Sequence, residues 1–584
     1  MASNDPFSVA DYLLTRLQQL GLTKVFQVPG DYVSHFMSAL DDFDGIDAVG
    51  EVNEMAAAYA ADGYARYTGI GAVSLQYSVG TFSALNAIAG AYVERNPLVL
   101  ISASPSAQNR DLIWSQDVLF HHSTGDLDVG RKVFEPVTVA SLILDDSLRA
   151  PALIDEALVK AISERRPIYL EAWQNVWGEP CPRPQGELQP LPARCDEDSM
   201  RAAIEASLLR LGSARSPLIM LGIEVARYGL QEQVMRLIEA SGLPFTTSLE
   251  AKTVVDESHP QFIGTYAGTA SRLWTQAFMQ DVDCILALGV IFTDDYLQLL
   301  NQDFSRIILV NSQLARTGLQ YYPHVPLPEY VQRLLGALGL DSDYPLRNHV
   351  PEPARPPLLQ QGAPDDALGY DLFLEILDGF ARQQNLWPGS SLILGESSAL
   401  YAASNINGLP RDSFVADAIW GSLGHETGCA LGVAMGSGRR PIVVAGDGGF
   451  MMICQSLSTL ARNRINALVF VMSNEVYAIE QAFVDIDAFE PGGQFAPFDT
   501  LPTWDYLALA KGFGAEGFKV STRAGLEQLL PQLLQIKDRP ALIQVVIPRQ
   551  DLAPQIKRLA KPDGPSFVAR HSHDNDNDND NDND

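Results

Sequence analysis

The sequence has few cysteines and no long apolar run. Its five cysteines are scattered without the spacing of a metal site: Cys181, Cys195, Cys284, Cys429 and Cys454. A sparse and odd set of this kind is typical of free thiols in a reducing compartment. No stretch approaches the ~20 apolar residues of a membrane span, and the N-terminus lacks the basic and apolar regions of a secretory signal. We therefore expect a cytoplasmic protein.

Positive charge is also scarce. Lysine and arginine total 41 against 71 acidic residues, so the formal net charge is -30. Nucleic acid and anionic membranes would be repelled, and neither is expected as a partner. Six of the negative charges lie in the alternating Asp/Asn tail at 574–584, which has nothing to bury and is predicted to be disordered. Weak calcium binding is the alternative, but the tail lacks the glycine and closing glutamate of an EF-hand.

The length and the apolar pattern predict several domains. A chain of 584 residues is too long for one core, and about three domains are expected. Strand-like runs alternate with helix-like segments, which is typical of parallel sheets covered on both faces. We predict three consecutive doubly wound α/β domains at 1–180, 200–340 and 367–550, and a C-terminal extension at 551–584. Two linkers follow from composition, one at 178–199 and one at 344–366 with six prolines.

Individual elements follow from the same pattern. In the first block we predict helices at 7–20 and 51–67, and strands at 25–28, 73–75, 98–101 and 168–171. In the middle block we predict strands at 218–221, 284–288 and 307–310.

The third block contains the most informative pattern. An apolar strand at 441–445 leads into Gly446-Asp447-Gly448, a predicted helix at 450–463, a second strand at 467–471, and then Asn474. Parallel strands of such a unit end at the edge where open α/β sheets bind ligands. A carboxylate and an amide oxygen beside glycines suit a hard divalent cation that holds a phosphate. A capping aspartate in an ordinary turn is the alternative for the triplet alone, and the distant asparagine favours the metal site.

This combination resembles the signature of thiamine-diphosphate enzymes, with Ser473-Asn474 where that family usually has Asn-Asn. Within the superfamily, Trp-Gly-Ser-Leu-Gly at 420–424 and Tyr-Ala-Ile-Glu at 477–480 resemble the pyruvate and indolepyruvate decarboxylases rather than the synthases or oxidases. The resemblance spans residues 7–550 and is diffuse in the middle block, apart from 252–266.

The resemblance implies thiamine diphosphate and Mg²⁺ as cofactors. The metal would be held by the side chains of Asp447 and Asn474 and by the carbonyl of Val476. The residues implied around the cofactor itself are Glu54, Gly421, Leu423, Gly446, Gly448 and Ile479. Of these, the Gly421 carbonyl would hold the pyrimidine amino group, and Leu423 would bend the two cofactor rings together so that the imino nitrogen reaches C2.

Glu54 is implied to activate the cofactor. The stretch 53–66 closely resembles the decarboxylase segment that carries the activating glutamate. A protonated carboxyl at the pyrimidine N1′ favours the imino tautomer, whose nitrogen takes the proton from thiazolium C2. Burial is expected to keep that carboxyl protonated. A helix-surface glutamate is the alternative.

Four further residues match the proton-handling set of 2-oxo acid decarboxylases: Asp31, His121, His122 and Glu480. Paired histidines in a loop are, taken alone, more often surface residues. After the C2 carbanion attacks the keto group and CO₂ leaves, an enamine remains that must be protonated before an aldehyde is released. Glu480 would act at decarboxylation, while Asp31 and the histidines would relay protons for release.

The implied function is therefore non-oxidative decarboxylation of a 2-oxo acid to an aldehyde and CO₂, a lyase reaction. One alternative is a carboligase that forms an acyloin from the same enamine. Another is an inactive cofactor-binding scaffold, but loss of Glu54 or Asp447 would be its signature and both are present. For the substrate, Ile479 resembles pyruvate-type members, while Thr293-Asp294 resembles branches that take larger acids.

Several positions depart from the family. Val476 stands where the family usually has a glycine, and Ala399 stands where it usually has a hydroxyl-bearing residue near the diphosphate. His425 stands where the family usually has an aromatic residue, and we assign no effect to this change. Gln-Tyr-Ser at 76–78 differs from the usual Thr-Phe-Gly, and 488–500 replaces a shorter lid-like segment.

The two ends of the implied site lie in different blocks of the sequence. One cofactor must touch both Glu54 and Asp447. In the resembling family these blocks come from different subunits, which implies a homodimer or homotetramer with sites at the subunit interface.

Overall fold

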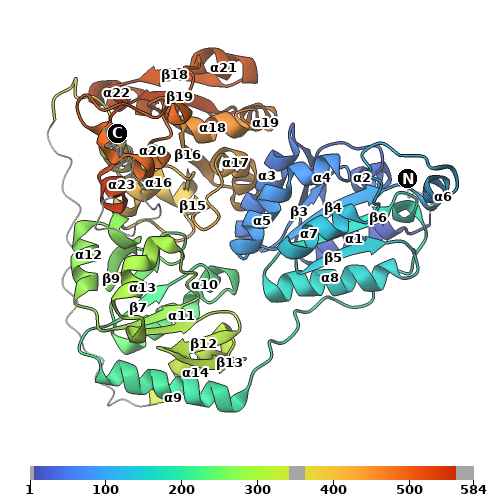
Figure 1. Cartoon of the computed structure of the whole chain (residues 1–584), viewed down its shortest axis with the longest axis horizontal. Helices are drawn as coiled ribbons and strands as arrows, with labels where there is room; N and C mark the ends of the chain where they lie inside the picture. The colour runs from blue at the N-terminus through green and yellow to red at the C-terminus, as the bar shows by residue number, and fades with distance from the viewer. Residues whose placement is uncertain (1–5, 341–361, 561–584) are drawn as a thin grey trace, which may run out of the picture.

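The computed structural model describes residues 6–340 and 362–560. It contains three α/β units, each built around its own sheet (Figure 1). The prediction for the Asp/Asn tail, and for most of the proline-rich segment at 344–366, falls outside the described residues. No helix in the described ranges is long and apolar enough to cross a bilayer.

The first domain has a six-stranded sheet with the order β2-β1-β3-β4-β6-β5, in which every pair is parallel. The strands are β1 (Lys24–Gln27), β2 (Asp47–Gly50), β3 (Gly71–Ser74), β4 (Leu98–Ser104), β5 (Ala140–Leu144) and β6 (Ile168–Trp173). The helices are α1 (Val9–Gln19), α2 (Ser34–Asp42), α3 (Glu54–Thr68), α4 (Val79–Ser83), α5 (Leu85–Val93), α6 (Ala107–Gln116), α7 (Val129–Phe134) and α8 (Ala150–Glu164).

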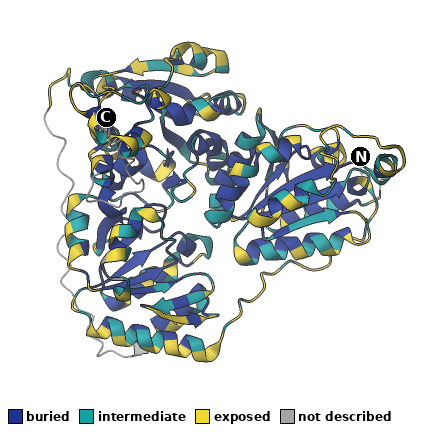
Figure 2. Cartoon of the chain, viewed as in Figure 1, coloured by how far each residue is buried: buried dark blue, intermediate teal, exposed yellow. Residues whose placement is uncertain are grey.

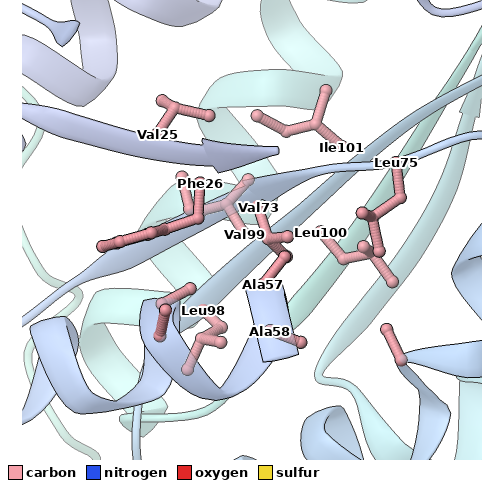
Figure 3. Packing of buried hydrophobic residues seen from close by; sticks show 14 of the residues in the cluster. Val25, Phe26, Ala57, Ala58, Val73, Leu75, Leu98, Val99, Leu100 and Ile101 are labelled. Atoms are coloured by element: carbon pink, nitrogen blue, oxygen red, sulfur yellow. The ribbon is translucent and has the colours of Figure 1, made fainter. Parts of the chain in front are cut away.

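Helix α3 packs directly on this sheet. Its alanines, including Ala57 and Ala58, lie against Phe26 of β1 and Val73 of β3 in the buried core (Figure 3). Because alanine is small, the helix axis approaches the strands closely. The helix begins at Glu54 rather than at residue 51, since the side chain of Asn53 accepts a hydrogen bond from the backbone N–H of Ala56 at 3.1 Å and caps the helix.

The central domain has a seven-stranded sheet with the order β13-β12-β11-β10-β7-β8-β9. Its strands are β7 (Pro217–Leu221), β8 (Phe245–Ser248), β9 (Phe262–Tyr266), β10 (Cys284–Leu288), β11 (Ile307–Val310), β12 (Leu314–Thr317) and β13 (Gln320–Pro323). Its helices are α9 (Glu197–Ser213), α10 (Glu224–Arg227), α11 (Gln231–Ser241), α12 (Leu273–Gln280), α13 (Leu297–Asp303) and α14 (Leu327–Leu340).

One edge of the central sheet departs from the parallel arrangement. Strands β12 and β13 form an antiparallel hairpin beside β11. Gly318 in the two-residue turn has a φ of 57°, and hairpin turns of this length need a positive φ there. The sequence pattern missed this hairpin because β12 is only half-buried and β13 is largely exposed, so neither presents a continuous apolar run.

The third domain repeats the topology of the first, with the order β15-β14-β16-β17-β19-β18 and only parallel pairs. Its strands are β14 (Ser390–Leu394), β15 (Phe414–Ala416), β16 (Arg440–Gly446), β17 (Leu468–Ser473), β18 (Glu516–Val520) and β19 (Ala541–Val546). Its helices are α15 (Tyr370–Gln383), α16 (Ser398–Ala402), α17 (His425–Ser437), α18 (Asp447–Ile453), α19 (Ser456–Arg462), α20 (Ala478–Val484), α21 (Tyr506–Phe513), α22 (Arg523–Leu533) and α23 (Pro554–Leu559).

The single helix predicted at 450–463 is wrong, because the segment forms two helices, α18 and α19. Between them, the N–H groups of Leu457 and Ser458 bond to carbonyls three residues back, at 3.1 and 3.0 Å. Such tightened bonding interrupts an α-helix without any proline or glycine that would mark it in the sequence. The first helix also starts earlier than predicted, at Asp447 itself.

The first and third domains contact each other where α3 crosses α17 (Figure 1). Both helices are buried at this crossing (Figure 2). A Cβ atom at Gly432 would lie 1.7 Å from the carbonyl oxygen of Ala60, and one at Gly63 would lie 2.4 Å from that of Cys429. The two backbones can approach this closely only because glycine occupies both positions.

Gly432→Ala should therefore destabilise the protein. The added methyl group meets backbone that cannot rotate away, and overpacking of this kind costs about 1–3 kcal/mol. Urea unfolding measures the loss. Gly512→Ala is the matched control, because Gly512 lies in α21 with no atom near its Cβ position, and alanine is the better helix former by up to about 1 kcal/mol. Equal stability of the two variants would contradict the close crossing.

Candidate active site

A pocket lies at the carboxyl ends of β14, β16 and β17, with the loop after β15 at its side. The strand order reverses between β14 and β16, and ligands of open α/β sheets bind at such a reversal. Of the residues predicted for the site, those in the pocket wall are Leu423, Gly446, Asp447, Gly448, Asn474, Val476, Ile479 and Glu480. Gly421 lies beside the pocket, next to Glu396.

Asp447 is the buried carboxylate of this pocket, with 2% of its surface exposed. Its Oδ2 accepts hydrogen bonds from the backbone N–H groups of Asn474 at 3.1 Å and Glu475 at 2.6 Å, and its Oδ1 accepts one from Gly448 at 3.0 Å. Burial raises the pKa of Asp447 to about 6, although the backbone donors oppose that rise. The carboxylate thus joins the turn after β17 to the start of α18.

Asn474 and Val476 supply the other oxygens that the sequence predicts for a metal. The Asn474 Oδ1 accepts a hydrogen bond from the Val476 N–H at 3.3 Å, while its buried Nδ2 has no partner. A carboxylate, an amide oxygen and a main-chain carbonyl are oxygen donors suited to Mg²⁺. Among the described residues, no cluster of three or more His, Cys, Asp or Glu side chains offers a different kind of metal centre.

The wall beside Asp447 contains a glycine at a close approach and two serine hydroxyls. A Cβ atom at Gly448 would lie 2.2 Å from the Tyr477 ring, so the glycine permits a turn that a larger residue would block. Ala399 is buried and offers no hydroxyl, as the sequence shows. Ser397 and Ser398 precede it and line the pocket, so hydroxyl groups are present on this side although the usual one is missing.

The pocket is also lined by two glutamates, one of which was not singled out from the sequence. Glu396 lines the pocket together with Glu480. Burial, Asp295 of the central domain and Glu480 together raise the pKa of Glu396 to about 8. The Tyr401 hydroxyl lies 3.4 Å from Asp295 Oδ1. No motif marks Glu396, because its setting depends on groups from two domains.

The lid-like segment at 488–500 is tied to the turn that carries Asn474. The Tyr477 N–H donates to the carbonyl of Asp499 at 2.8 Å, and Val476 forms a β-bridge with Thr500. Burial and the nearby Glu480 raise the pKa of Asp499. The longer segment therefore adds a further carboxyl group beside Glu480.

The other predicted catalytic residues form a cluster on the first domain. Asp31 Oδ1 accepts a hydrogen bond from Gln76 Nε2 at 2.6 Å, and the Tyr77 hydroxyl donates to the carbonyl of His121. The His122 ring packs edge-on against Tyr77, with centroids 5.9 Å apart. Asp31, His121 and His122 are all exposed. Gln76, noted from the sequence only as a departure, thus holds one of the predicted acids.

Glu54 belongs to the same side of the molecule. It is partly exposed, and a Cβ atom at Gly80 would lie 3.6 Å from its Cγ and 3.3 Å from the Cβ of Gln76. The structure therefore places Glu54 near the Asp31 cluster. The pocket that contains Asp447 is lined by third-domain residues alone, so the predicted site residues form two groups, one on each domain.

The α3–α17 crossing links these two groups within the chain. The hydroxyls of Tyr59 on α3 and Ser422 in the loop before α17 lie 2.5 Å apart. The Trp420 indole N–H donates to Asn86 Oδ1 at 2.8 Å. The loop that contains Leu423 is thereby held against the first domain.

Family models match all three domains. Residues 7–128 match the N-terminal TPP-binding domain of thiamine pyrophosphate enzymes, residues 204–338 the central domain, and residues 395–545 the C-terminal TPP-binding domain.

Whole-chain relatives are similar along almost their full length. The chain is 28% identical to an alpha-keto-acid decarboxylase of Mycobacterium avium, over 97% of this chain and 99% of the relative. It is 29% identical to a pyruvate decarboxylase of Aspergillus fumigatus, over 95% of this chain and 97% of that relative. A solved thiamin diphosphate-dependent enzyme structure from Mycobacterium smegmatis superposes with a TM-score of 0.72 at 20% identity, covering 93% of this chain and 99% of that one. This last match shows the shared fold.

Proposed function

The chain belongs to the thiamine-diphosphate-dependent 2-oxo acid decarboxylase family, and we propose from this membership that it converts a 2-oxo acid to an aldehyde and CO₂. The observation that carries the proposal is the pocket at the strand-order reversal, which Asp447, Asn474 and Glu480 line together. That cavity combines oxygen donors for a metal with an acid for proton transfer. The carboligase alternative is not favoured, because the relatives are named as decarboxylases.

The residues present fit thiamine diphosphate with Mg²⁺. Asp447, Asn474 and the Val476 carbonyl would hold the metal, and the turn at Gly446 and Gly448 would lie along the diphosphate. When bound, the cofactor supplies a carbanion that attacks the keto carbon and accepts the electrons left behind by CO₂. The unpartnered Asn474 Nδ2 and the buried Asp447 carboxylate are polar groups that such an occupant would satisfy.

The protein's own groups would position the reactants and handle protons. Leu423 would support the bent form of the cofactor, and Ile479 lines the pocket together with Glu480. Glu54 would donate a hydrogen bond to the pyrimidine ring. Glu480 would serve at the decarboxylation step, and Asp31, His121 and His122 would return protons for aldehyde release.

We further propose that the site is completed between two copies of the chain. The pocket contains no first-domain residue, and Glu54 lies beside Gly80 of the first domain. Exposed apolar side chains flank both groups: Val52 and Val79 near Glu54, and Trp420 and Met452 near the pocket. Exposed apolar groups of this kind support an interface, in a homodimer or in a homotetramer built from two such dimers. The five unpaired cysteines support the cytoplasm as the location.

The reaction is tested by CO₂ release from a panel of pyruvate, branched-chain 2-oxo acids, phenylpyruvate and indolepyruvate, with thiamine diphosphate and Mg²⁺ present. We expect stoichiometric aldehyde from at least one acid. The panel also identifies the substrate, because Ile479 resembles pyruvate-type members whereas Thr293-Asp294 resembles branches that take larger 2-oxo acids. Acyloin as the main product would favour the carboligase, and no CO₂ from any acid would contradict the proposal.

Activity should fall as the pH rises through about 8. Glu396, with a pKa of about 8, is protonated at neutral pH and becomes a carboxylate above it, beside Glu480 and the incoming 2-oxo acid anion. Glu396→Gln removes this ionisation, so its alkaline decline in kcat/KM should shift to higher pH or disappear. Glu527→Gln, at an exposed position on α22, is the control. If kcat/KM of Glu396→Gln declines at the same alkaline pH as that of the unsubstituted protein, Glu396 is not the group responsible.

A further inference from the structure

The α3–α17 crossing contains one buried polar contact that the proposed reaction does not use. His425 Nε2 and Asp62 Oδ2 are 2.8 Å apart, and each side chain is only 3% exposed. His425 is the first residue of α17 and follows Gly424 directly. It occupies the position where the resembling family has an aromatic residue. This contact joins the end of the loop that contains Leu423 to the helix that begins at Glu54.

The direction of the hydrogen bond follows from the state of Asp62. Burial disfavours its ionisation, but Arg66 and His425 outweigh that effect and hold the pKa of Asp62 well below its usual range. Because a carboxylate can only accept, His425 Nε2 carries the proton and donates it. The other ring nitrogen, Nδ1, is buried without a partner.

The Asp62 carboxylate has two hydrogen-bond donors besides His425. Its Oδ2 also accepts from Arg66 Nε at 2.8 Å, and its Oδ1 accepts from Asn96 Nδ2 at 2.8 Å. Both donors belong to the first domain, and His425 is the one donor to this carboxylate, among the described residues, that comes from the third. The Asp62 carboxylate is therefore held in place within the first domain. The hydrogen bond from His425 joins the loop that contains Leu423 to this carboxylate.

The packing of the His425 ring can be tested separately from the hydrogen bond that the ring donates to Asp62. The His425 ring packs edge-on against Tyr59, with centroids 5.3 Å apart and an interplanar angle of 83°. An aromatic residue without a donor would keep this packing and lose only the bond to Asp62. The same Tyr59 holds Ser422 through its hydroxyl, so the loop has one tether on each side of Leu423.

We propose that His425 is a positioning residue for the reaction proposed above, on which this inference rests. Through its bond to Asp62 it keeps the 420–424 loop at a set distance from α3. Leu423 is thereby held in the orientation in which it supports the bent cofactor. His425 does not line the pocket that contains Asp447, and its contribution is made through the loop.

The test compares two variants of the full-length protein. His425→Phe keeps the ring packing and removes the donor, whereas His425→Gln places an amide N–H near the position of Nε2. Losing a charge-assisted hydrogen bond costs enough for about a tenfold fall in kcat, which we expect for His425→Phe. His425→Gln should recover most of that loss. Both should keep the thiamine diphosphate dissociation constant of the unchanged protein, because the metal and diphosphate groups lie elsewhere in the pocket.

A second measurement does not depend on turnover. Hydrogen–deuterium exchange of the cofactor-free protein should show faster exchange at 420–424 in His425→Phe than in either the unchanged protein or His425→Gln. Equal exchange and equal kcat in all three proteins would overturn the proposal. So would a loss of kcat in His425→Gln as large as that in His425→Phe. If none of the three releases CO₂ from any 2-oxo acid, the proposed function fails, while the exchange result still tests the tether.

Discussion

Asp447→Ala should leave a folded protein that retains neither cofactor nor measurable activity. The substitution removes the charged oxygen donor for the metal, and with it the counter-charge of the diphosphate. It also leaves the N–H groups of Gly448, Asn474 and Glu475 without their acceptor, so the turn that carries the other metal ligands loses its shape. A loss of several kcal/mol in transition-state stabilisation corresponds to a fall of at least about a hundredfold.

Cofactor retention is measured by dialysis followed by quantification of bound thiamine diphosphate, and activity by CO₂ release at saturating Mg²⁺. Asp538→Ala provides the control, because Asp538 is an exposed aspartate of the same domain. Circular dichroism checks that the variant is folded. Full occupancy by thiamine diphosphate in Asp447→Ala would refute the metal assignment.

Glu54→Gln should bind cofactor and remain almost inactive. The amide keeps the size of the side chain but cannot hold a proton that is shared with the pyrimidine ring, and removal of a general acid–base group costs about 10²–10⁴ in rate. The pocket around Asp447 is formed by other residues, so the diphosphate end is unaffected. Retained cofactor with lost turnover distinguishes this variant from Asp447→Ala. Full activity would show that Glu54 has no role in the reaction.

Mixing these two inactive variants tests where the site is completed. If Glu54 of one copy serves the Asp447 pocket of another, a hybrid dimer has one site with both substitutions and one with neither. Because one of the two sites is then intact, each hybrid dimer should have about half the activity of the unsubstituted dimer. If both residues act within one chain, every site in the hybrid carries one substitution and no activity returns. Subunit exchange must be verified by native mass spectrometry before a negative result is interpreted.

Much of the fold could be read from the sequence because buried parallel strands form continuous apolar runs. The strands at 284–288 and 307–310 have the predicted bounds, and the Gly-Asp-Gly turn lies at the strand end where it was expected. Thiamine diphosphate chemistry was likewise accessible, since its motifs are local and are borne out by the family models. The hairpin of β12 and β13 and the break between α18 and α19 were missed, because their causes lie in exposure and backbone geometry.

By itself, the sequence determined several of the buried strands, the Gly-Asp-Gly turn that follows one of them, and that the chain is a thiamine-diphosphate enzyme. These properties depend on contacts between near neighbours and on a strand-by-strand apolar pattern. Only the tertiary structure decided that Glu396 lies among other carboxyl groups, that Gln76 holds Asp31, and that His425 bonds to Asp62 across 363 positions of the chain. Such settings arise when segments far apart in the sequence pack together, and the desolvation and hydrogen bonds that define them have no counterpart in any local stretch of sequence.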